Sequence, residues 1–158
     1  MKKTQALVVS AALAIAMTAP ASAGVNDPEI IIYRFAGVKD DGGANNLGVA
    51  TVFQCTNFSG EGEHVRFVSR GVSGFLISNQ FESIGHLGSV TSVTHVNAAY
   101  GATSSLIMNT SAMQGTVAIA ATSINVICTA MTVDAANPKP DGVALRGIRF
   151  NPAPGSQE

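Results

Sequence analysis

The sequence predicts an all-β protein, an antiparallel β-sandwich of about eight or nine strands. Three observations favour this fold: short β-branched and apolar segments recur along the chain, clusters of Gly, Asn, Asp and Pro separate them, and no long segment has the 3.6-residue apolar period of a helix. A single domain fits the length of 158 residues. The expected strands cover residues 29–35, 48–56, 63–70, 74–78, 89–96, 100–108, 115–121, 123–134 and 143–150.

The first 23 residues have the pattern of a secretory signal peptide of bacterial type. Two lysines precede an apolar stretch over residues 6–16, and residues 21–23 (Ala-Ser-Ala) form a small-x-small cleavage site. The apolar stretch is shorter than the roughly 20 residues that a membrane-spanning helix needs, so we expect cleavage after Ala23. The β-sandwich domain then covers residues 24–158, with a short disordered tail from about residue 151 and no transmembrane segment. The sequence therefore predicts a secreted or periplasmic protein.

The charge of the exported part excludes several classes of partner. After Ala23 the chain has seven basic and ten acidic residues, a net charge of −3. This balance excludes a strongly basic nucleic-acid-binding protein, and no run of basic residues favours an anionic membrane surface. Arginines on the outward side of the expected strands could still present a basic strip to an acidic partner or polysaccharide, although they could equally protect sheet edges. The candidate strip comprises Arg34, Arg66, Arg70, Arg146 and Arg149.

Two cysteines in an exported chain predict a structural disulfide between Cys55 and Cys128. Both lie in β-branched segments, and no His or Lys adjoins either one to make a reactive thiol. Free buried thiols and a redox pair are the alternatives. We expect the disulfide to join the two facing sheets, in an immunoglobulin-like architecture. The chain has no tryptophan to pack on the bridge, so this likeness concerns architecture and does not indicate a function.

Alternation along the expected strands predicts which side chains face the core. Val65 and Phe67 are expected inward, with His64, Arg66 and Arg70 outward. The other expected inward sets are Val49, Thr51, Phe53 and Cys55; Val117, Ile119 and Ala121; Ile124, Val126, Cys128 and Ala130; and Val143 with Leu145.

The last strand and the aromatic residues complete the expected core. Gly147 is expected to form a bulge that resets the alternation, so that Ile148 and Phe150 also face inward. The seven Phe and two Tyr mostly alternate with other apolar residues, which leaves no aromatic platform for sugars. Residues 30–32 (Ile-Ile-Ile) are expected in a core strand, with addition to a neighbour's sheet edge as the alternative.

The loop at residues 40–46 contains the candidate metal ligands. Carboxylate and amide oxygens from Asp40, Asp41, Asn45 and Asn46 are of the type that Ca²⁺ prefers. The loop lacks the alternating spacing and the closing Glu of a helix-loop-helix calcium site, and the same residue types form ordinary tight turns. The three histidines show no metal-binding spacing. We therefore expect no cofactor.

The sequence contains no motif that predicts an enzyme. Neither Ser73 nor Ser78 lies in a G-x-S-x-G elbow, and a triad assembled from distant His and Asp residues would be arbitrary. The carboxylates of Glu61, Glu63 and Glu82 lie near turns, with nothing to indicate a glycosidase pair. We expect no catalytic residue.

The sequence thus predicts an exported, non-catalytic structural or interaction module of the bacterial envelope or extracellular space. The alternative is a β-sandwich that binds a small molecule or a glycan, with or without calcium. The partner is unknown from the sequence: an envelope protein, a polysaccharide and a second copy of the chain remain open, and nucleic acid is excluded.

Overall fold

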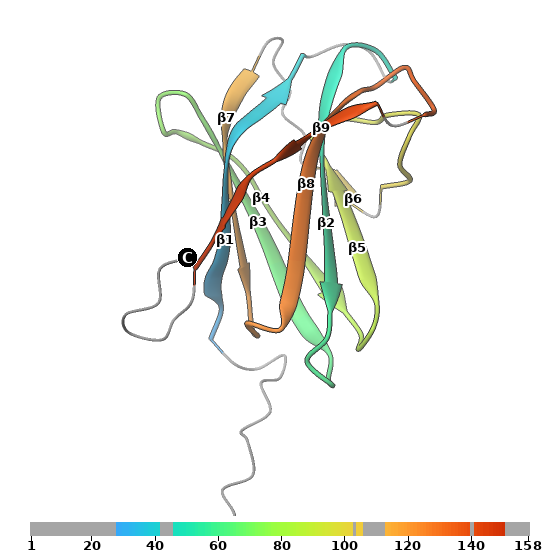
Figure 1. Ribbon diagram of the computed structural model, residues 1–158. Helices are drawn as coiled ribbons and strands as arrows, with labels where there is room; N and C mark the ends of the chain where they lie inside the picture. The colour runs from blue at the N-terminus through green and yellow to red at the C-terminus, as the bar shows by residue number, and fades with distance from the viewer. Residues whose placement is uncertain (1–27, 42–45, 103, 106–112, 140, 151–158) are drawn as a thin grey trace, which may run out of the picture.

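The computed structural model describes residues 28–41, 46–102, 104–105, 113–139 and 141–150, which form two facing β-sheets without a helix (Figure 1). The predicted antiparallel β-sandwich is confirmed. The first sheet has five antiparallel strands. In spatial order these are β10 (Gly147–Arg149), β1 (Ile30–Asp40), β7 (Met113–Ala121), β3 (Glu63–Gly71) and β4 (Leu76–Ile84).

The second sheet packs against the first. Its strands in spatial order are β6 (Ser104–Ser105), β5 (Ser89–Val93), β2 (Val49–Asn57), β8 (Val126–Asp134) and β9 (Gly142–Leu145). All its neighbours are antiparallel except the two-residue β6, which runs parallel to β5. The described part of the chain contains no helix of the length and apolarity that a membrane crossing requires. The predicted signal peptide and the tail from residue 151 lie outside the described residues.

The core between the sheets is built around three phenylalanines. Phe35 of the first sheet meets Phe53 of the second at 5.6 Å between ring centroids, and Phe53 meets Phe67 of the first sheet at 6.3 Å. Each ring is fully buried, which stabilises the fold by roughly 1.5–3 kcal/mol per side chain. The alternation predicted for β3 and β7 is confirmed. The aliphatic side chains around the rings include Val38, Val65, Val90, Val117, Ile119 and Val126.

A second, smaller core lies on the outer face of the second sheet. Val52 and Val93, a cross-strand pair on β2 and β5, are buried there. Residues 94–100 pack against this cluster, and the Tyr100 hydroxyl donates a hydrogen bond to Sδ of Met131 at 3.1 Å. Strand β2 is therefore apolar on both faces. The predicted inward positions of Phe53 and Cys55 are confirmed, and Thr51 also faces the first sheet, where its hydroxyl bonds to the backbone of Lys39.

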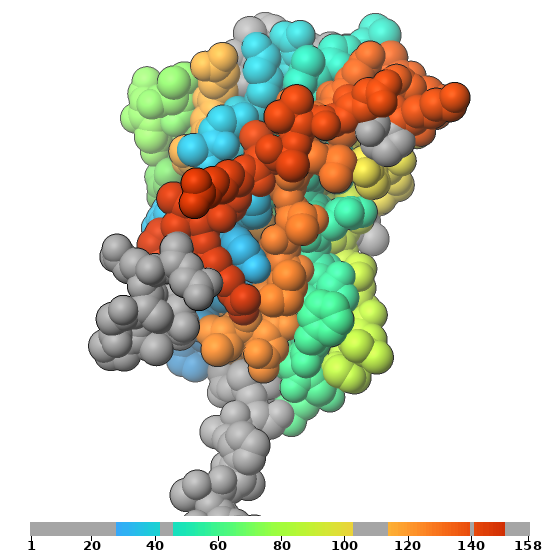
Figure 2. Space-filling model, viewed as in Figure 1, coloured from blue at the N-terminus to red at the C-terminus, as the bar shows by residue number. Residues whose placement is uncertain are grey.

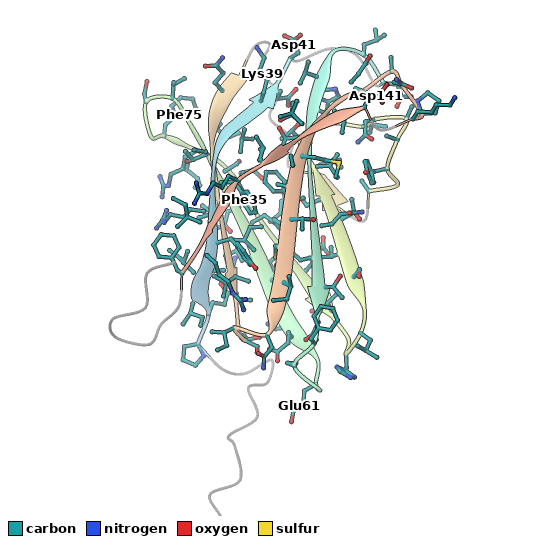
Figure 3. The ribbon with its side chains drawn as sticks, in the orientation of Figure 1. Phe35, Lys39, Asp41, Glu61, Phe75 and Asp141 are labelled. Carbon is teal, nitrogen blue, oxygen red and sulfur yellow. A yellow bond between two sulfur atoms is a disulfide. The ribbon has the colours of Figure 1, made fainter. Side chains whose placement is uncertain are left out.

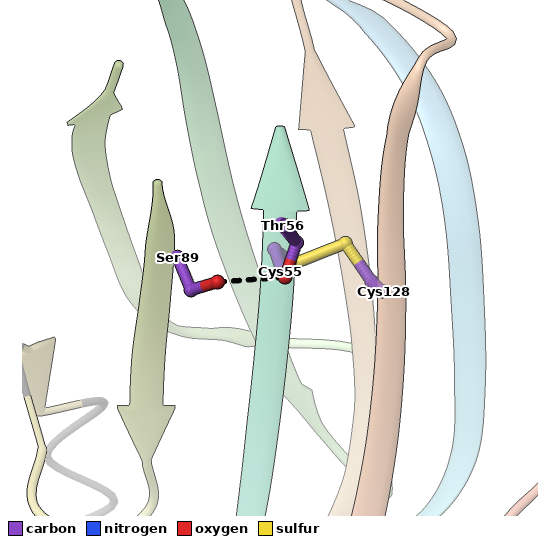
Figure 4. The surroundings of a disulfide bond; sticks show 4 residues. All are labelled: Cys55, Thr56, Ser89 and Cys128. Atoms are coloured by element: carbon purple, nitrogen blue, oxygen red, sulfur yellow. Dashed lines mark hydrogen bonds between the residues drawn. A yellow bond between two sulfur atoms is a disulfide. The ribbon is translucent and has the colours of Figure 1, made fainter. Parts of the chain in front are cut away.

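The predicted disulfide between Cys55 and Cys128 is present, but the expectation that it joins the two sheets is wrong (Figure 4). The two cysteines are register partners on β2 and β8, neighbours in the second sheet, with Cα atoms 4.1 Å apart. The sulfurs face the core, and they close a loop with a sequence separation of 73 residues. For a loop of this length the chain-entropy model gives about 4 kcal/mol of stabilisation.

The segment expected to form one strand over residues 143–150 passes from one sheet to the other. Strand β9 pairs with β8 in the second sheet, and β10 pairs with β1 in the first, so the segment crosses the front of the molecule diagonally (Figures 1 and 2). A Cβ atom on Gly147 would lie 2.5 Å from the ring of Phe35, so the crossing requires glycine.

The crossing overturns several predicted orientations. Val143 is 72% exposed and Ile148 is 55% exposed, and Phe150 is also exposed, because both strands lie at sheet edges. Leu145 does pack against the core. Ile124 precedes β8 and is exposed, so its expected inward position is wrong as well.

Some strand bounds also differ from the prediction. Strand β1 continues to Asp40, and β4 covers Leu76–Ile84 rather than residues 74–78. Residues 30–32 belong to a strand paired with β7 along its length, as expected for a core strand. Of the strand expected over residues 100–108, the structure has Ser104–Ser105, and residues 106–108 lie outside the described residues.

Candidate functional site

Three of the five candidate arginines share the outer face of the first sheet. Arg34 lies on β1, and Arg66 and Arg70 lie on β3, with β7 between the two strands. Two strand spacings, about 10 Å, therefore separate β1 from β3. The side chains that β7 presents between the arginines are small: Thr116, Ala118 and Ala120. We call this surface, with its three arginines and three small residues, the arginine valley.

The other two candidate arginines do not join the valley. Arg149 on β10 donates a hydrogen bond from Nη2 to the carbonyl oxygen of Ile124 at 2.7 Å, and its guanidinium lies 5.8 Å from the ring centroid of Tyr33. Arg146 is exposed at the crossing between β9 and β10. Whether the arginines form one patch depends on strand order, and the structure unites three of them.

One end of the valley is closed by an ion pair. Arg66 donates from Nε to Glu29 Oε2 at 2.6 Å and from Nη2 to Glu29 Oε1 at 2.9 Å, across β7. Its Nη1 donates to Oδ1 of Asn79 at 3.2 Å. The hydrogen bonds to Glu29 raise the pKa of Arg66, with desolvation opposing and the charge of Glu29 adding to the effect. Arg66 therefore stays charged, and its charge is balanced by Glu29.

Positive charge without an acidic partner gathers at the other end of the valley. Within the described ranges, no carboxylate lies within ion-pair distance of Arg34, Arg70 or Lys39. Arg70 donates from Nη1 to the carbonyl oxygen of Gly74 at 2.9 Å, and the guanidinium of Arg34 lies 5.5 Å from the ring centroid of Phe150. These three groups leave a local excess of positive charge on a chain whose formal net charge is −1.

A pocket of about 380 Å³ continues the valley at this charged end. Three of its residues are glycines from neighbouring strands: Gly37 on β1, Gly115 on β7 and Gly71 on β3. The remaining lining residues are Lys39, Val72, Gln114 and Thr116, and we call the whole the glycine pocket. Figure 3 shows Lys39 and Phe75 at this end of the molecule, opposite Glu61.

The fold itself requires these glycines. Gly71 and Gly115 are register partners. A Cβ atom on Gly115 would overlap the carbonyl oxygen of Arg70, and one on Gly71 would lie 2.7 Å from the ring of Phe75. Gly37 has a φ of +73° at an irregularity of β1, a conformation that side chains other than glycine rarely adopt. Because these positions carry no Cβ atom, the ring of Phe75 can pack on Gly71 and the carbonyl of Arg70 can lie close to Gly115.

Most aromatics were expected in the core, and Tyr33, Phe35, Phe53 and Phe67 are buried there, but exposed aromatic rings border this face. Phe81 is 49% exposed and lies beside Arg66, with 5.7 Å from the guanidinium to the ring centroid, and beside His64 at 5.1 Å between rings. Phe75 packs on Gly71. In the sequence, Phe81 stands among the polar residues Asn79, Gln80 and Glu82, whereas a core strand would have an apolar residue at every second position. This pattern is the signal that could have identified Phe81 as exposed. The exposed phenylalanines are Phe58, Phe75, Phe81 and Phe150.

The calcium candidates do not converge. Asp40 is 1% exposed, and its Oδ1 lies 2.7 Å from Nδ1 of His95, whose Nε2 lies 2.9 Å from the carbonyl oxygen of Leu47. Asp41 and Asn46 are exposed, and Asn45 lies outside the described residues. In the part of the chain that the structure describes, no group of three or more His, Cys, Asp or Glu side chains could hold a metal ion. Asp40 thus fastens residues 94–100 to β1.

The carboxylates considered for catalysis are also dispersed. Glu63 is fully buried, and its Oε2 accepts a hydrogen bond from the hydroxyl of Thr122, which itself accepts one from the backbone N–H of His64. Glu61 is exposed in the loop between β2 and β3, and Glu82 lies on β4. The buried carboxylate therefore helps to join β3 to the end of β7.

A second group of exposed apolar side chains lies at the opposite end of the sandwich. Leu87 is 65% exposed and has a φ of 60°, a strained value for leucine. Its backbone N–H donates to the carbonyl oxygen of Asn57 at 2.8 Å, and the N–H of Phe58 donates to that of Asn125 at 3.1 Å. These bonds hold three loops together at this end of the sandwich.

No family model, curated protein or solved structure matches this chain. The outer face of the first sheet is therefore the feature that indicates a function. Its outer face combines a floor of small side chains, cations without a described acidic partner, a pocket and bordering aromatic rings. Such a surface is suited to binding an elongated anion.

Proposed function

We propose that the protein is an exported, non-catalytic interaction module of the bacterial envelope or extracellular space, and that it binds an acidic polymer in the arginine valley. The proposal rests mainly on the positive charge of Lys39, Arg34 and Arg70, which have no ion-pair partner among the described residues and lie beside a floor of small side chains. The exported part has a net charge of −3, so this local excess of positive charge does not follow from the overall composition.

Two features support export. The pattern of residues 1–23 is that of a signal peptide, with a small-x-small site that ends at Ala23. The disulfide between Cys55 and Cys128 is consistent with folding in an oxidising compartment. Cleavage would leave a domain that begins a few residues before β1.

A polymer is favoured over a small anion because the cations are separated. A single exposed ion pair contributes about 0–1 kcal/mol, so one anion at one of these side chains would bind weakly. A chain that reaches several cations gains from each contact after the first is made, because the later contacts are intramolecular. The floor presents no large side chain that would lift such a chain away from β7.

The test is a binding titration of the purified, disulfide-bonded protein with two acidic polymers, polygalacturonate and polyglutamate, and with neutral dextran. We expect at least one acidic polymer to bind, with an affinity that falls as salt rises, because exposed charges are screened. The triple variant with Arg34→Gln, Arg70→Gln and Lys39→Gln should bind at least tenfold more weakly.

The matched control replaces two exposed cations outside the valley, as Arg146→Gln with Lys139→Gln. Its affinity should stay within about twofold of the parent, since single exposed charges contribute little. Equal losses in both variants would indicate a general charge effect and contradict the proposed site. If neither acidic polymer binds, the proposed function itself is wrong.

A further inference from the structure

The glycine pocket points to the chemical class of the acidic polymer. We infer that the partner is an acidic polysaccharide and that the pocket holds one of its carboxylated sugar rings. This inference rests on the proposed function, because the pocket is the charged end of the arginine valley and shares Thr116 with the valley floor.

The size and floor of the pocket suit one ring. A volume of about 380 Å³ lies near the lower end of the range of 300–1,000 Å³ found for ligand sites. Glycines from three neighbouring strands contribute to the lining, so no side chain of these three residues projects into the pocket. Phe75, packed on Gly71, adds an exposed apolar surface beside the pocket.

The polar groups of the lining match a sugar acid. The ammonium of Lys39 supplies a cation for one carboxylate. The amide of Gln114 and the hydroxyl of Thr116 can each donate and accept hydrogen bonds, which is what sugar hydroxyls require. A phosphate or sulfate group would instead favour several converging donors, such as paired arginine forks. Val72 is the apolar side chain of the lining, and it is exposed.

The backbone of the valley argues against an extended acidic peptide. Strand β7 pairs with β1 on one side and with β3 on the other, so its N–H and C=O groups are already engaged. A peptide lying over Ala118 and Ala120 would lose water from its own backbone groups without gaining a β-strand partner. Edge strands accept peptides by strand addition, and β7 is not an edge. Polygalacturonate has no backbone amide groups to satisfy in this way.

The test combines binding titrations with amide chemical shifts of the disulfide-bonded protein. The probes are polygalacturonate, a galacturonate trisaccharide, monomeric galacturonate, neutral dextran and polyglutamate. We expect the trisaccharide to bind and to shift the backbone amides of Gly37, Gly71 and Gly115. Monomeric galacturonate should bind at least tenfold more weakly than the trisaccharide, because it cannot reach beyond the pocket.

Two substitutions separate the pocket from the rest of the valley. Thr116→Val removes one hydroxyl with little change of shape, and Lys39→Gln removes the cation of the pocket. Each should weaken trisaccharide binding at least fivefold while the melting temperature stays within about 2 °C, as expected for surface substitutions. Thr132→Val, on the second sheet, is the matched control and should leave affinity unchanged.

The outcomes distinguish the two proposals. If polygalacturonate binds through the arginines but the glycine amides and Thr116→Val show no effect, the pocket inference fails and the proposed function stands. If polyglutamate binds and polygalacturonate does not, the partner is a peptide and this inference fails alone. If monomeric galacturonate binds as tightly as the trisaccharide, the ligand is a free sugar acid and the polysaccharide is excluded. If no acidic probe binds, both proposals fail.

Discussion

The outer faces of the two sheets differ in their exposure to water: the outer face of the second sheet is covered, and that of the first is open. On the second sheet, Val52 and Val93 face outward in a buried cluster, and Tyr100 at the end of the segment 94–100 packs against this cluster as part of a cover. On the first sheet, β7 presents Thr116, Ala118 and Ala120, none of which is fully buried. Small side chains expose little apolar area, so this face can remain in water without a cover. The outer face of the first sheet can therefore stay exposed because its central strand, β7, carries small side chains there.

Charged residues also have different roles at the covering segment and on the open face. At the end of β1, the carboxylate of Asp40 lies against the ring of His95 and holds the covering segment in place. On the open face, Arg34, Arg70 and Lys39 have no described carboxylate within ion-pair distance. Buried polar pairs stabilise this fold, whereas the unpaired cations are available to a partner.

The largest expected effect is on the open face, at Gly115. A Cβ atom there would overlap the carbonyl oxygen of Arg70, so Gly115→Ala must push β7 and β3 apart. We expect the free energy of unfolding to fall by about 3 kcal/mol, measured by urea denaturation. Gly101→Ala is the matched control, because nothing lies within 4 Å of its added Cβ atom, and it should change stability by less than about 0.5 kcal/mol. Equal unfolding midpoints for the two variants would show that the strands can adjust.

A smaller loss of the free energy of unfolding is expected when the contact between the covering segment and Asp40 is removed. His95→Ala removes the ring that contacts Asp40 and Leu47, and it leaves a buried carboxylate without this donor. The expected loss is about 2–3 kcal/mol. His86→Ala, which removes one exposed acceptor for the N–H of Gly60, should cost under about 1 kcal/mol. Proteolysis within residues 94–102 should become faster in the first variant alone; unchanged cleavage would contradict this role of the contact.

The smallest effects are expected for Val→Ala substitutions, which compare the burial of one side-chain type on the two faces. Val93→Ala removes a buried side chain under the cover and should lower the free energy of unfolding by about 1.5–2 kcal/mol. Val68→Ala removes a half-buried side chain on the open face and should lower it by under about 1 kcal/mol. Similar losses would mean that the open face is more protected from water than its geometry indicates. The readout is again the urea midpoint.

Local patterns predicted much of the fold. Turn residues and β-branched segments located most strands, and alternation placed Val65 and Phe67 inward and Arg66 outward. The cysteine count predicted the disulfide. These features depend on residues near one another in sequence, where the period of a strand is visible.

Features that depend on strand order could not be obtained in this way. Cys55 and Cys128 lie in segments of similar composition, and nothing in either shows that they are neighbours in one sheet. The candidate site has the same origin: the arginine valley exists because β7 lies between β1 and β3, and the glycine pocket exists because Gly71 and Gly115 fall in register. These pairings join residues more than 40 positions apart, and a single sequence contains no signal for them.

The crossing from β9 to β10 has a consequence for the timing of folding. Strand β1 is the first to be synthesised, yet its partners β7 and β10 begin at Met113 and Gly147. The first sheet is therefore incomplete until residues 147–149 have been made, because β10 fills its edge and, through the crossing from β9, ties it to the second sheet. Long-range pairing of this kind folds slowly compared with local contacts.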